Sequence, residues 1–432
     1  MLVNFRFKNF RSFYNETNLS LQATKNKELR EFNTFEVDEK LLGKNNNELI
    51  KSAVIFGSNA SGKTNVIRAL TYMLNCIRLS AANPLPFIKG NEYFAFYDEA
   101  SKEESLYEVE IIKNNAYYRY GFTIKEGKIT NEWLDRKVER ITNIFKRDVE
   151  KISINGQEQG LMGLIKIPAE TLFLSIANNF NLKNIEYIKD VIAWFNSLLI
   201  VFENNANSLD IYSLEGGKYH NQALEILKKA DIGIKSFEVE KDKIANVLNP
   251  NDVLALNTQM QINPEKYMGQ LKQEQENLYK IDLKTFFNVF DKNNNVVGQK
   301  EIKLIKDIGF NSEGTVRLLN YLGWILAALD KGRVILIDEI DSKLHFLVAD
   351  YLINLFNSID NNPKNSQLIC TAHNIMLLDK DLRRDQIYLT CKDDFGVSKL
   401  TCLSDYKGVR KNDLFSKKYL AGFYSNLPYM GK

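Results

Sequence analysis

Apolar residues along this chain form two patterns, alternation and unbroken runs, and each pattern predicts a different kind of strand. Residues 105–112 and 116–124 alternate apolar with polar side chains, which is the period of a strand that buries one face. Unbroken apolar runs at 53–56, 334–337 and 367–372 are instead typical of strands buried on both faces of a parallel sheet. The sequence therefore predicts antiparallel strands in its first third and buried strands at 53–56, 334–337 and 367–372.

Apolar residues at helical spacing predict the helices. They are found at 65–76, 318–329 and 346–358, and again at 185–199 and 221–229. Buried strands that alternate with amphipathic helices indicate the α/β class, here a mixed sheet flanked by helices. The sustained heptad repeat of a long coiled coil is missing from the sequence.

The segment between the first buried run and the first helix, residues 57–64, reads GSNASGKT. Gly57, Gly62, Lys63 and Thr64 fill the fixed positions of the phosphate-binding P-loop, in which backbone N–H groups and a lysine bind phosphates and a hydroxyl binds magnesium. A glycine-rich turn is the alternative, but a strand before the loop and a helix after it favour the P-loop. We therefore expect ATP and Mg²⁺ as cofactors. The candidate nucleotide-binding residues are Gly57, Ser58, Asn59, Ala60, Ser61, Gly62, Lys63 and Thr64.

Acidic residues and a histidine follow the two later buried runs. Asp338 and Glu339 end the first of these runs, and in P-loop enzymes such an aspartate helps to hold magnesium while the glutamate polarises the attacking water. His373 ends the second run, where it could hydrogen-bond the γ-phosphate or that water. The alternatives are solvated acids and a structural histidine. We expect Glu339 and His373 to be catalytic, and Thr64 with Asp338 to bind the metal.

Residues 311–319 read NSEGTVRLL and lead into the predicted helix over 318–329. Ser312 and Gly314 would then lie at a helix N-terminus, where unpaired N–H groups can bind an anion. An ordinary capped helix start is the alternative.

Composition narrows the functional classes. The 432 residues are 44% hydrophobic and 26% charged, with a net charge of +3 that permits contact with nucleic acid without requiring it. No apolar run approaches the length of a membrane span and the N-terminus lacks a signal-peptide core, so we expect a cytoplasmic protein. Four cysteines have no metal-site spacing and are expected to be reduced. Of three histidines, His345 and His373 fall within the ATPase motifs, which argues against a second centre built on histidines.

These motifs together resemble the SMC/RecF-like branch of ABC ATPases, particularly the prokaryotic abortive-infection ATPases allied to the OLD family. The segments that carry the resemblance are NFRSF at 9–13, GSNASGKT, SEGTVRLL, LIDEIDSKLH at 336–345 and TAHN at 371–374. The resemblance implies a split head domain, dimerisation of two heads on ATP, and a role in DNA repair or anti-phage defence. It also implies a composite site in which Ser312 and Gly314 of one subunit contact the γ-phosphate held by another.

The resemblance implies further roles by motif position. Asn9, Arg11 and Ser12 would lie near the nucleotide, residues 341–345 would cross the dimer interface, and His373 would be the switch histidine. The sequence departs from the family in three ways: SEGT replaces LSGGQ, no convincing coupling glutamine is present, and only about 60 residues follow TAHN. Because that is too short for the Toprim nuclease of OLD proteins, we expect any nuclease to be a separate chain.

The motifs also predict domain boundaries. We expect an N-terminal lobe of the head at 1–134, an inserted and mainly helical domain at 135–300, and a C-terminal lobe at 301–432. Interleaved lysines and glutamates over 266–284 favour a solvated helix face over a nucleic-acid site. The aromatic and basic tail, 405–432, favours a closing helix packed on the head, with base stacking as the alternative.

Three functions remain open at this point. The first is a dimeric anti-phage defence ATPase whose partners are a second copy of itself and a separately encoded effector such as a Toprim-type nuclease. The second is a RecF-like repair ATPase that clamps DNA. The third, a transporter's nucleotide-binding subunit, is disfavoured because such subunits carry LSGGQ and no insertion of about 165 residues. No membrane partner is expected.

Overall fold

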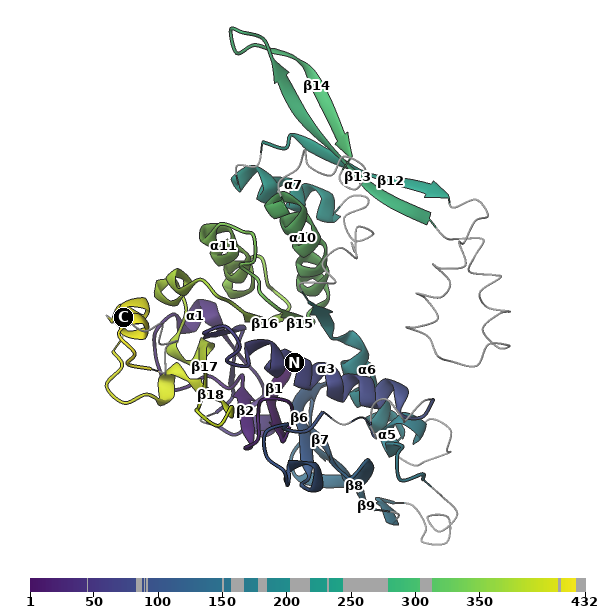
Figure 1. The fold of residues 1–432 in the computed structure, drawn as a ribbon. Coiled ribbons are helices and arrows are strands. Elements are labelled where there is room, and N and C mark those ends of the chain that lie inside the picture. The colour runs from purple at the N-terminus through teal and green to yellow at the C-terminus, as the bar shows by residue number, and fades with distance from the viewer. Residues whose placement is uncertain are drawn as a thin grey trace. The chain divides into compact units, whose positions relative to one another are not determined.

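Two compact units make up the chain in the computed structural model. The structure describes residues 1–44, 46–82, 88, 90, 92–149, 151–156, 167–177, 185–202, 218–230, 233–243, 279–303, 313–410 and 413–424. Met1–Glu203 and Ala328–Lys432 form the first unit, here called the head unit, and Asn204–Ala327 form the inserted unit. Figure 1 labels the elements of both units. The sequence-distant halves of the head unit are joined through its sheets.

The head unit contains a seven-stranded antiparallel sheet of order β10-β9-β8-β7-β6-β1-β2. The strands are β1 (Leu2–Lys8), β2 (Thr17–Ser20), β6 (Ser105–Lys113), β7 (Ala116–Lys125), β8 (Lys128–Lys137), β9 (Ile141–Asp148) and β10 (Lys151–Ile154). Both segments with predicted alternation are strands here, β6 and β7. Alternate tyrosines such as Tyr107 and Tyr120 are fully buried, because a strand turns successive side chains to opposite faces.

A second sheet of the head unit, of order β11-β15-β16-β5-β17-β18, carries the predicted chemistry. Its strands are β5 (Ser52–Gly57), β11 (Leu199–Val201), β15 (Val334–Ile337), β16 (Gln367–Thr371), β17 (Ile387–Lys392) and β18 (Ser398–Cys402). All neighbours are parallel except β17 and β18. This mixed sheet with flanking helices confirms the expected P-loop α/β fold.

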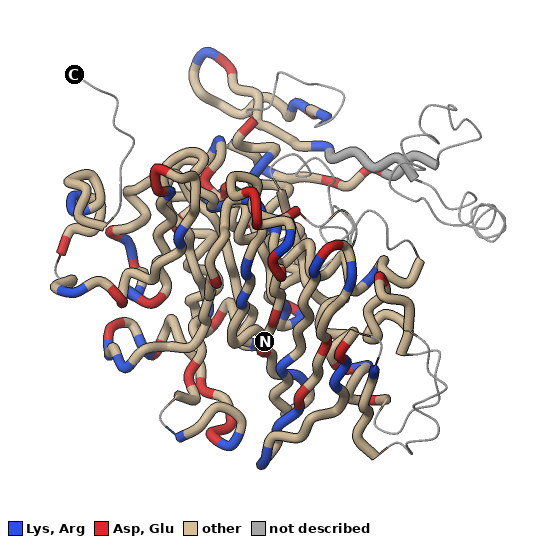
Figure 2. Tube along the Cα trace, turned by 60° about the horizontal axis from the view of Figure 1, so that its bottom comes forward, with Lys and Arg blue, Asp and Glu red and all other residues tan. Residues whose placement is uncertain are grey.

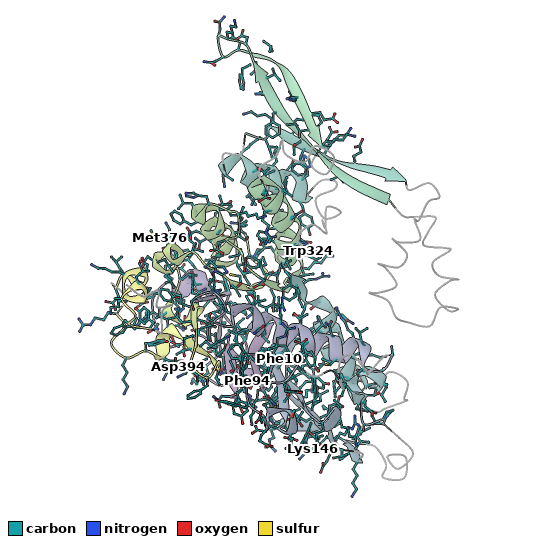
Figure 3. All side chains as sticks on the ribbon, viewed as in Figure 1. Phe10, Phe94, Lys146, Trp324, Met376 and Asp394 are labelled. Carbon is teal, nitrogen blue, oxygen red and sulfur yellow. The ribbon has the colours of Figure 1, made fainter. Side chains whose placement is uncertain are left out.

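Helices cover the strands of the head unit. They are α1 (Arg30–Asn33), α2 (Glu39–Leu42), α3 (Lys63–Leu79), α5 (Phe173–Ile176), α6 (Ile185–Ser197), α11 (Phe346–Asn357) and α12 (Phe415–Leu420), with 3-10 turns η2 (Ala100–Lys102), η6 (Ile375–Asp379), η7 (Arg384–Gln386) and η8 (Leu403–Asp405). Short strands β3 (Thr34–Glu36) and β4 (Glu48–Ile50) form a separate pair. The apolar face of α3 joins the main core, where Tyr72 packs against Phe10 and Tyr107. Figure 3 shows the described side chains and labels Phe10.

The tail packs on the head unit as expected from its aromatics. Phe415, Tyr419 and Tyr424 are buried, whereas Phe423 is 53% exposed. Residues 425–432 lie outside the described residues. Lysines and arginines are interspersed with aspartates and glutamates along the described trace (Figure 2). None of the helices in the described ranges is both long and apolar enough to cross a membrane.

The inserted unit contains strands as well as helices, which differs from the mainly helical domain predicted for 135–300. Its described elements are α7 (Lys218–Lys229), β12 (Ser236–Lys243), β13 (Tyr279–Phe290), β14 (Val296–Lys303) and most of α10 (Glu313–Lys331). The three strands form an antiparallel sheet of order β12-β13-β14. Residues 135–203 belong instead to the head unit, where they supply β9, β10 and β11.

Charge pairing explains why these strands look like a solvated helix in the sequence. Lys284 lies on β13 and contacts Glu240 of β12 at 3.1 Å and Glu301 of β14 at 3.3 Å. Cross-strand pairs of opposite charge stabilise a sheet, although the same residues also suit a solvated helix face. Residues 266–278, where most of the predicted helix face falls, lie outside the described residues.

Candidate functional site

The predicted catalytic residues meet at one edge of the mixed sheet. The P-loop follows β5, Asp338 and Glu339 follow β15, and His373 follows β16 by two residues. Parallel strands end at the same edge of a sheet, so their carboxyl ends form a common crevice. A cavity of about 770 Å³ lies there, lined by Asn59, Ala60, Gly62, Lys63, Thr64, Asn65, Glu339, Asp341, Ser342, His373 and Lys392.

Glycine is required at the end of the P-loop by both conformation and space. Gly62 has a φ of 109°, which side-chain-bearing residues rarely adopt. A Cβ atom added there would lie 2.6 Å from the Ser398 Oγ atom and 3.0 Å from the Ser12 Oγ atom. The hydroxyl side chains of Ser398 on β18 and of Ser12 in the N-terminal segment therefore lie directly against Gly62. Ser61 joins this support through its Oγ atom, which lies 2.6 Å from the Thr390 Oγ1 atom of β17.

Lys63 folds its ammonium group back into the loop. Its Nζ atom donates to the carbonyl oxygens of Gly57 at 2.9 Å and Ser58 at 3.0 Å. Burial lowers the pKa of the Lys63 ammonium, and the nearby carboxylates of Glu339 and Asp338 partly oppose that shift. The cation is thus held by two neutral carbonyls at the place where a P-loop lysine contacts phosphate.

Asp338 and Thr64 are brought together as predicted for a metal site. The Thr64 Oγ1 atom donates to the Asp338 Oδ1 atom at 3.0 Å. A hydroxyl and a carboxylate fit Mg²⁺, which is usually bound by one or two protein oxygens together with substrate phosphates and water. The described residues contain no cluster of three or more acidic, histidine or cysteine side chains that could hold a metal alone. A pair of this kind binds Mg²⁺ together with further oxygens, such as those of a nucleotide and water, so the metal role of Thr64 and Asp338 stays a prediction.

Glu339 and His373 contact each other directly. The His373 Nε2 atom lies 3.1 Å from the Glu339 Oε1 atom. Glu339 has a left-handed backbone, with a φ of 56°, and such strained conformations often occur at active sites. Its N–H group donates to the Thr371 Oγ1 atom at 2.7 Å, which holds the strained residue in place.

Two more residues contact this group: Thr371, which was not among the candidates, and Asp341, for which a place at the dimer interface was expected. Thr371, fully buried, also donates through its Oγ1 atom to the Asp338 Oδ1 atom at 2.7 Å. The Asp341 Oδ2 atom accepts from the N–H groups of His373 at 2.9 Å and Asn374 at 2.5 Å. Thr371 therefore connects the two acids to β16, and Asp341 fixes the backbone of the histidine. Asp341 lies in the segment LIDEIDSKLH and Thr371 lies in TAHN, so these two motifs were the only indication in the sequence that either residue belongs to the site.

The three N-terminal candidates do not line the cavity. The side-chain amide of Asn9 is used within the fold, since its Nδ2 atom donates to the Ala100 carbonyl at 2.8 Å and its Oδ1 atom accepts from the Phe94 N–H at 3.0 Å. Arg11 pairs with Glu92. Ser12 comes nearest, because its Oγ atom accepts from the Asn65 Nδ2 atom at 2.8 Å. Nucleotide contacts by these three residues remain predictions.

The described residues that line this cavity do not include the predicted signature residues. Ser312 lies outside the described residues. Gly314 is the second residue of α10 and belongs to the inserted unit. Their proposed contact with a nucleotide on another subunit stays a prediction.

A family model described as "AAA domain, putative AbiEii toxin, Type IV TA system" matches residues 52–379, which is about three quarters of the chain. The chain belongs to this family. Its AAA domain begins with β5 and extends past His373, so it includes the P-loop, Asp338 and Glu339 together with the inserted unit. Lys392 lies beyond the matched range.

Several solved structures are similar to this chain, among them heads of SMC proteins. An SMC head bound to the C-winged helix domain of ScpA is 15% identical, with 93% of this chain and 97% of that chain covered and a TM-score of 0.47. The Smc head of Pyrococcus furiosus with an extended coiled coil, bound to the C-terminal domain of ScpA, is 12% identical, with 93% and 95% covered and a TM-score of 0.40. The Smc head of Pyrococcus yayanosii with a coiled coil and joint is 10% identical, with 97% and 99% covered and a TM-score of 0.39. No curated protein matches the chain.

Proposed function

We propose that this AAA domain is a magnesium-dependent ATPase that controls a separately encoded effector in defence against phage. The observation that carries the proposal is the hydrogen bond between Thr64 and Asp338, which joins two motifs 274 residues apart in the sequence. If the glycine-rich loop and the acidic segment had unrelated roles, their side chains would not be expected to lie within hydrogen-bond distance. Their meeting is expected when both bind one metal–nucleotide complex.

Binding begins at the P-loop. Residues of the loop and of the first turn of α3 line the cavity, and their backbone N–H groups would supply donors for the β-phosphate. Lys63 exchanges its two carbonyl partners for phosphate oxygens, which form stronger, charge-assisted hydrogen bonds. Thr64 and Asp338 would hold Mg²⁺, whose charge offsets that of the phosphates.

Hydrolysis then depends on Glu339 and His373. The Glu339 carboxylate accepts a proton from the attacking water, while the His373 imidazole, 3.1 Å away, fixes the orientation of the carboxylate. Thr371 and Asp341 hold the backbones of these two residues. The side chains of His373 and Glu339 are 39% and 27% exposed. We propose that a second head covers them, with Ser312 and Gly314 of that head contacting the γ-phosphate.

The defence role is supported by the family description, which names a toxin of a toxin–antitoxin system. We propose that the nucleotide state of a homodimer holds a separately encoded effector, such as a nuclease, and releases or activates it on infection. The test is a phage challenge of cells that carry this gene with its neighbouring reading frames. Protection should be lost in Lys63→Ala. If protection is absent but the wild-type protein stays bound to circular DNA only with ATP, the DNA-clamping alternative is correct.

Glu339→Gln tests the chemistry. We expect ATP to bind with unchanged affinity, because the amide keeps the shape of the carboxylate. Hydrolysis should fall at least about a hundredfold, because the amide cannot accept the proton of water. Calorimetry measures the affinity and phosphate release measures the rate, with and without a magnesium chelator. Hydrolysis by Glu339→Gln at the wild-type rate would assign water activation to another residue.

A further inference from the structure

Lys392 places a cation in the nucleotide cavity that none of the sequence motifs contains. It is the last residue of β17, and it lines the cavity together with Lys63, Thr64 and Glu339. We propose that Lys392 binds the inner phosphates of the nucleotide, on the side of the P-loop away from Glu339 and His373. The assignment of Lys392 rests on the proposed ATPase function, and it adds a residue that positions the nucleotide substrate.

The order of strands gives Lys392 its place. Strand β5, which leads into the P-loop, lies between β16 and β17. Glu339 and His373 follow strands on the β16 side, whereas Lys392 ends the strand on the other side. A triphosphate that puts its terminal phosphate beside Glu339 and His373 therefore extends its inner phosphates across the P-loop toward β17.

The charge of Lys392 is available to a ligand. The side chain is half-buried, and the structure gives it no salt bridge or hydrogen bond to any residue in the described ranges. Its acidic neighbour Asp393 is used elsewhere: the Asp393 Oδ1 atom accepts from the N–H groups of Phe395 at 3.0 Å and Val397 at 2.8 Å in the turn between β17 and β18. A half-buried ammonium without a carboxylate partner favours an anionic ligand.

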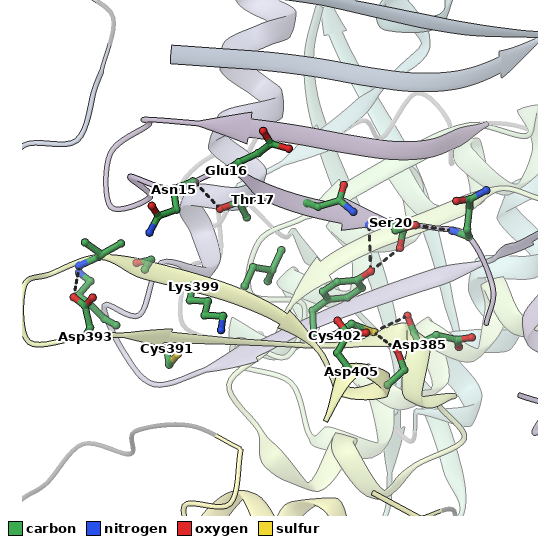
Figure 4. Close-up of a pocket in the computed structure, with 18 of the residues that line it drawn as sticks. Asn15, Glu16, Thr17, Ser20, Asp385, Cys391, Asp393, Lys399, Cys402 and Asp405 are labelled. Atoms are coloured by element: carbon green, nitrogen blue, oxygen red, sulfur yellow. Dashed lines mark hydrogen bonds between the residues drawn. The ribbon is translucent and has the colours of Figure 1, made fainter. Parts of the chain in front are cut away.

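A second cavity supplies a matched control. It measures about 650 Å³ and lies between β2 and the β17–β18 hairpin (Figure 4). Lys392 lines both this cavity and the nucleotide cavity. Lys399, labelled in Figure 4, lines this second cavity but not the first. It is an exposed lysine on β18, paired with Cys391 next to Lys392. Lys392→Ala and Lys399→Ala therefore remove the same charge from the same hairpin.

The experiment measures dissociation constants of ATP and ADP by calorimetry for wild type, Lys392→Ala, Lys392→Arg and Lys399→Ala, with hydrolysis at saturating ATP. We expect Lys392→Ala to weaken ATP and ADP alike by about tenfold, a loss typical of one charge-assisted phosphate contact. The rate at saturating ATP should stay within about twofold of wild type, because the inner phosphates are bound equally before and during hydrolysis. Lys392→Arg should recover most of the affinity, and Lys399→Ala should match wild type.

Other outcomes overturn the assignment in distinguishable ways. Unchanged affinities in Lys392→Ala would show that Lys392 does not contact the nucleotide. Loss of ATP affinity with normal ADP affinity would place the lysine at the γ-phosphate. Equal losses in Lys392→Ala and Lys399→Ala would indicate a general charge effect. If wild type binds neither nucleotide, the ATPase function fails and the assignment fails with it. Lys392→Gln, which keeps the aliphatic stem, replaces Lys392→Ala if the alanine variant unfolds.

Discussion

Replacing Thr371 with valine tests whether one buried hydroxyl organises the catalytic edge. The hydroxyl donates to the Asp338 carboxylate at 2.7 Å and accepts from the Glu339 N–H at 2.7 Å. A hydrogen bond to a charged group stabilises a fold by about 2 kcal/mol and one between neutral groups by about 1 kcal/mol. Valine has nearly the same shape but can form neither bond. We therefore expect Thr371→Val to lower the free energy of unfolding by about 3 kcal/mol.

The catalytic effect should exceed what lost stability alone explains. Without the Thr371 hydroxyl, the left-handed backbone of Glu339, which costs about 1–2 kcal/mol, can relax and move the carboxylate. A displacement of this kind should lower the rate at saturating ATP between about tenfold and about a hundredfold. Nucleotide affinity should change less than the rate, because Thr371 reaches Thr64 of the P-loop only through Asp338, whereas Lys63 and the rest of the loop would bind the phosphates directly.

Urea unfolding followed by tryptophan fluorescence measures the stability, since two of the three tryptophans, Trp133 and Trp194, lie in the head unit. Phosphate release measures the rate. Thr371→Ser is the matched control: it keeps the hydroxyl and should lose about 1 kcal/mol for the missing methyl group, with a near-normal rate. A valine variant as stable and as active as the serine variant would refute the role given to the hydroxyl.

Two further predictions concern nucleotide binding and assembly. Lys63→Ala should abolish ATP binding in calorimetry, because water cannot replace a desolvated charge–charge contact with phosphate; normal affinity would contradict the P-loop assignment. Ser312→Arg should leave ATP binding by the monomer nearly intact. It should block hydrolysis and the ATP-dependent increase in mass measured by light scattering, because a bulky cation would then occupy the proposed interface. Mixing Ser312→Arg with Lys63→Ala should restore partial activity, since one composite site in each heterodimer would be intact; normal hydrolysis by Ser312→Arg alone would leave SEGT as a helix cap.

Local motifs made the centre of the site predictable. The P-loop, the Asp338–Glu339 pair and His373 each follow an apolar run that forms a strand of the mixed sheet, so the geometry of that sheet alone brings them together. Periodicity also predicted β6, β7, α3 and α11 within a few residues. In these segments the hydrophobic pattern and the tertiary fold agree.

Residues whose roles depend on distant neighbours were not predictable. Lys392 matters only because β17 lies beside β5, which nothing in the sequence around residue 392 indicates. Asn9 was expected near the nucleotide by motif position, but its buried amide must satisfy its hydrogen bonds, and the nearest partners are backbone groups of the segment before β6. The strands of the inserted unit were missed because their lysines and glutamates pair across the sheet, a contact that sequence spacing does not reveal.

Strand β5 also has consequences for how the protein is made. Its sheet partners are β16, where Ser52 pairs with Leu368, and β17, where Gly57 pairs with Thr390. A ribosome adds about 5–20 residues per second, so about 15–60 s pass between synthesis of β5 and of either neighbour. During that interval the apolar strand has no native edge to join and is exposed to chaperones and to aggregation. The cavity at this edge of the sheet is complete only after Lys392 has left the ribosome, so we expect chains that end before β16 and β17 to leave β5 without its two native neighbours.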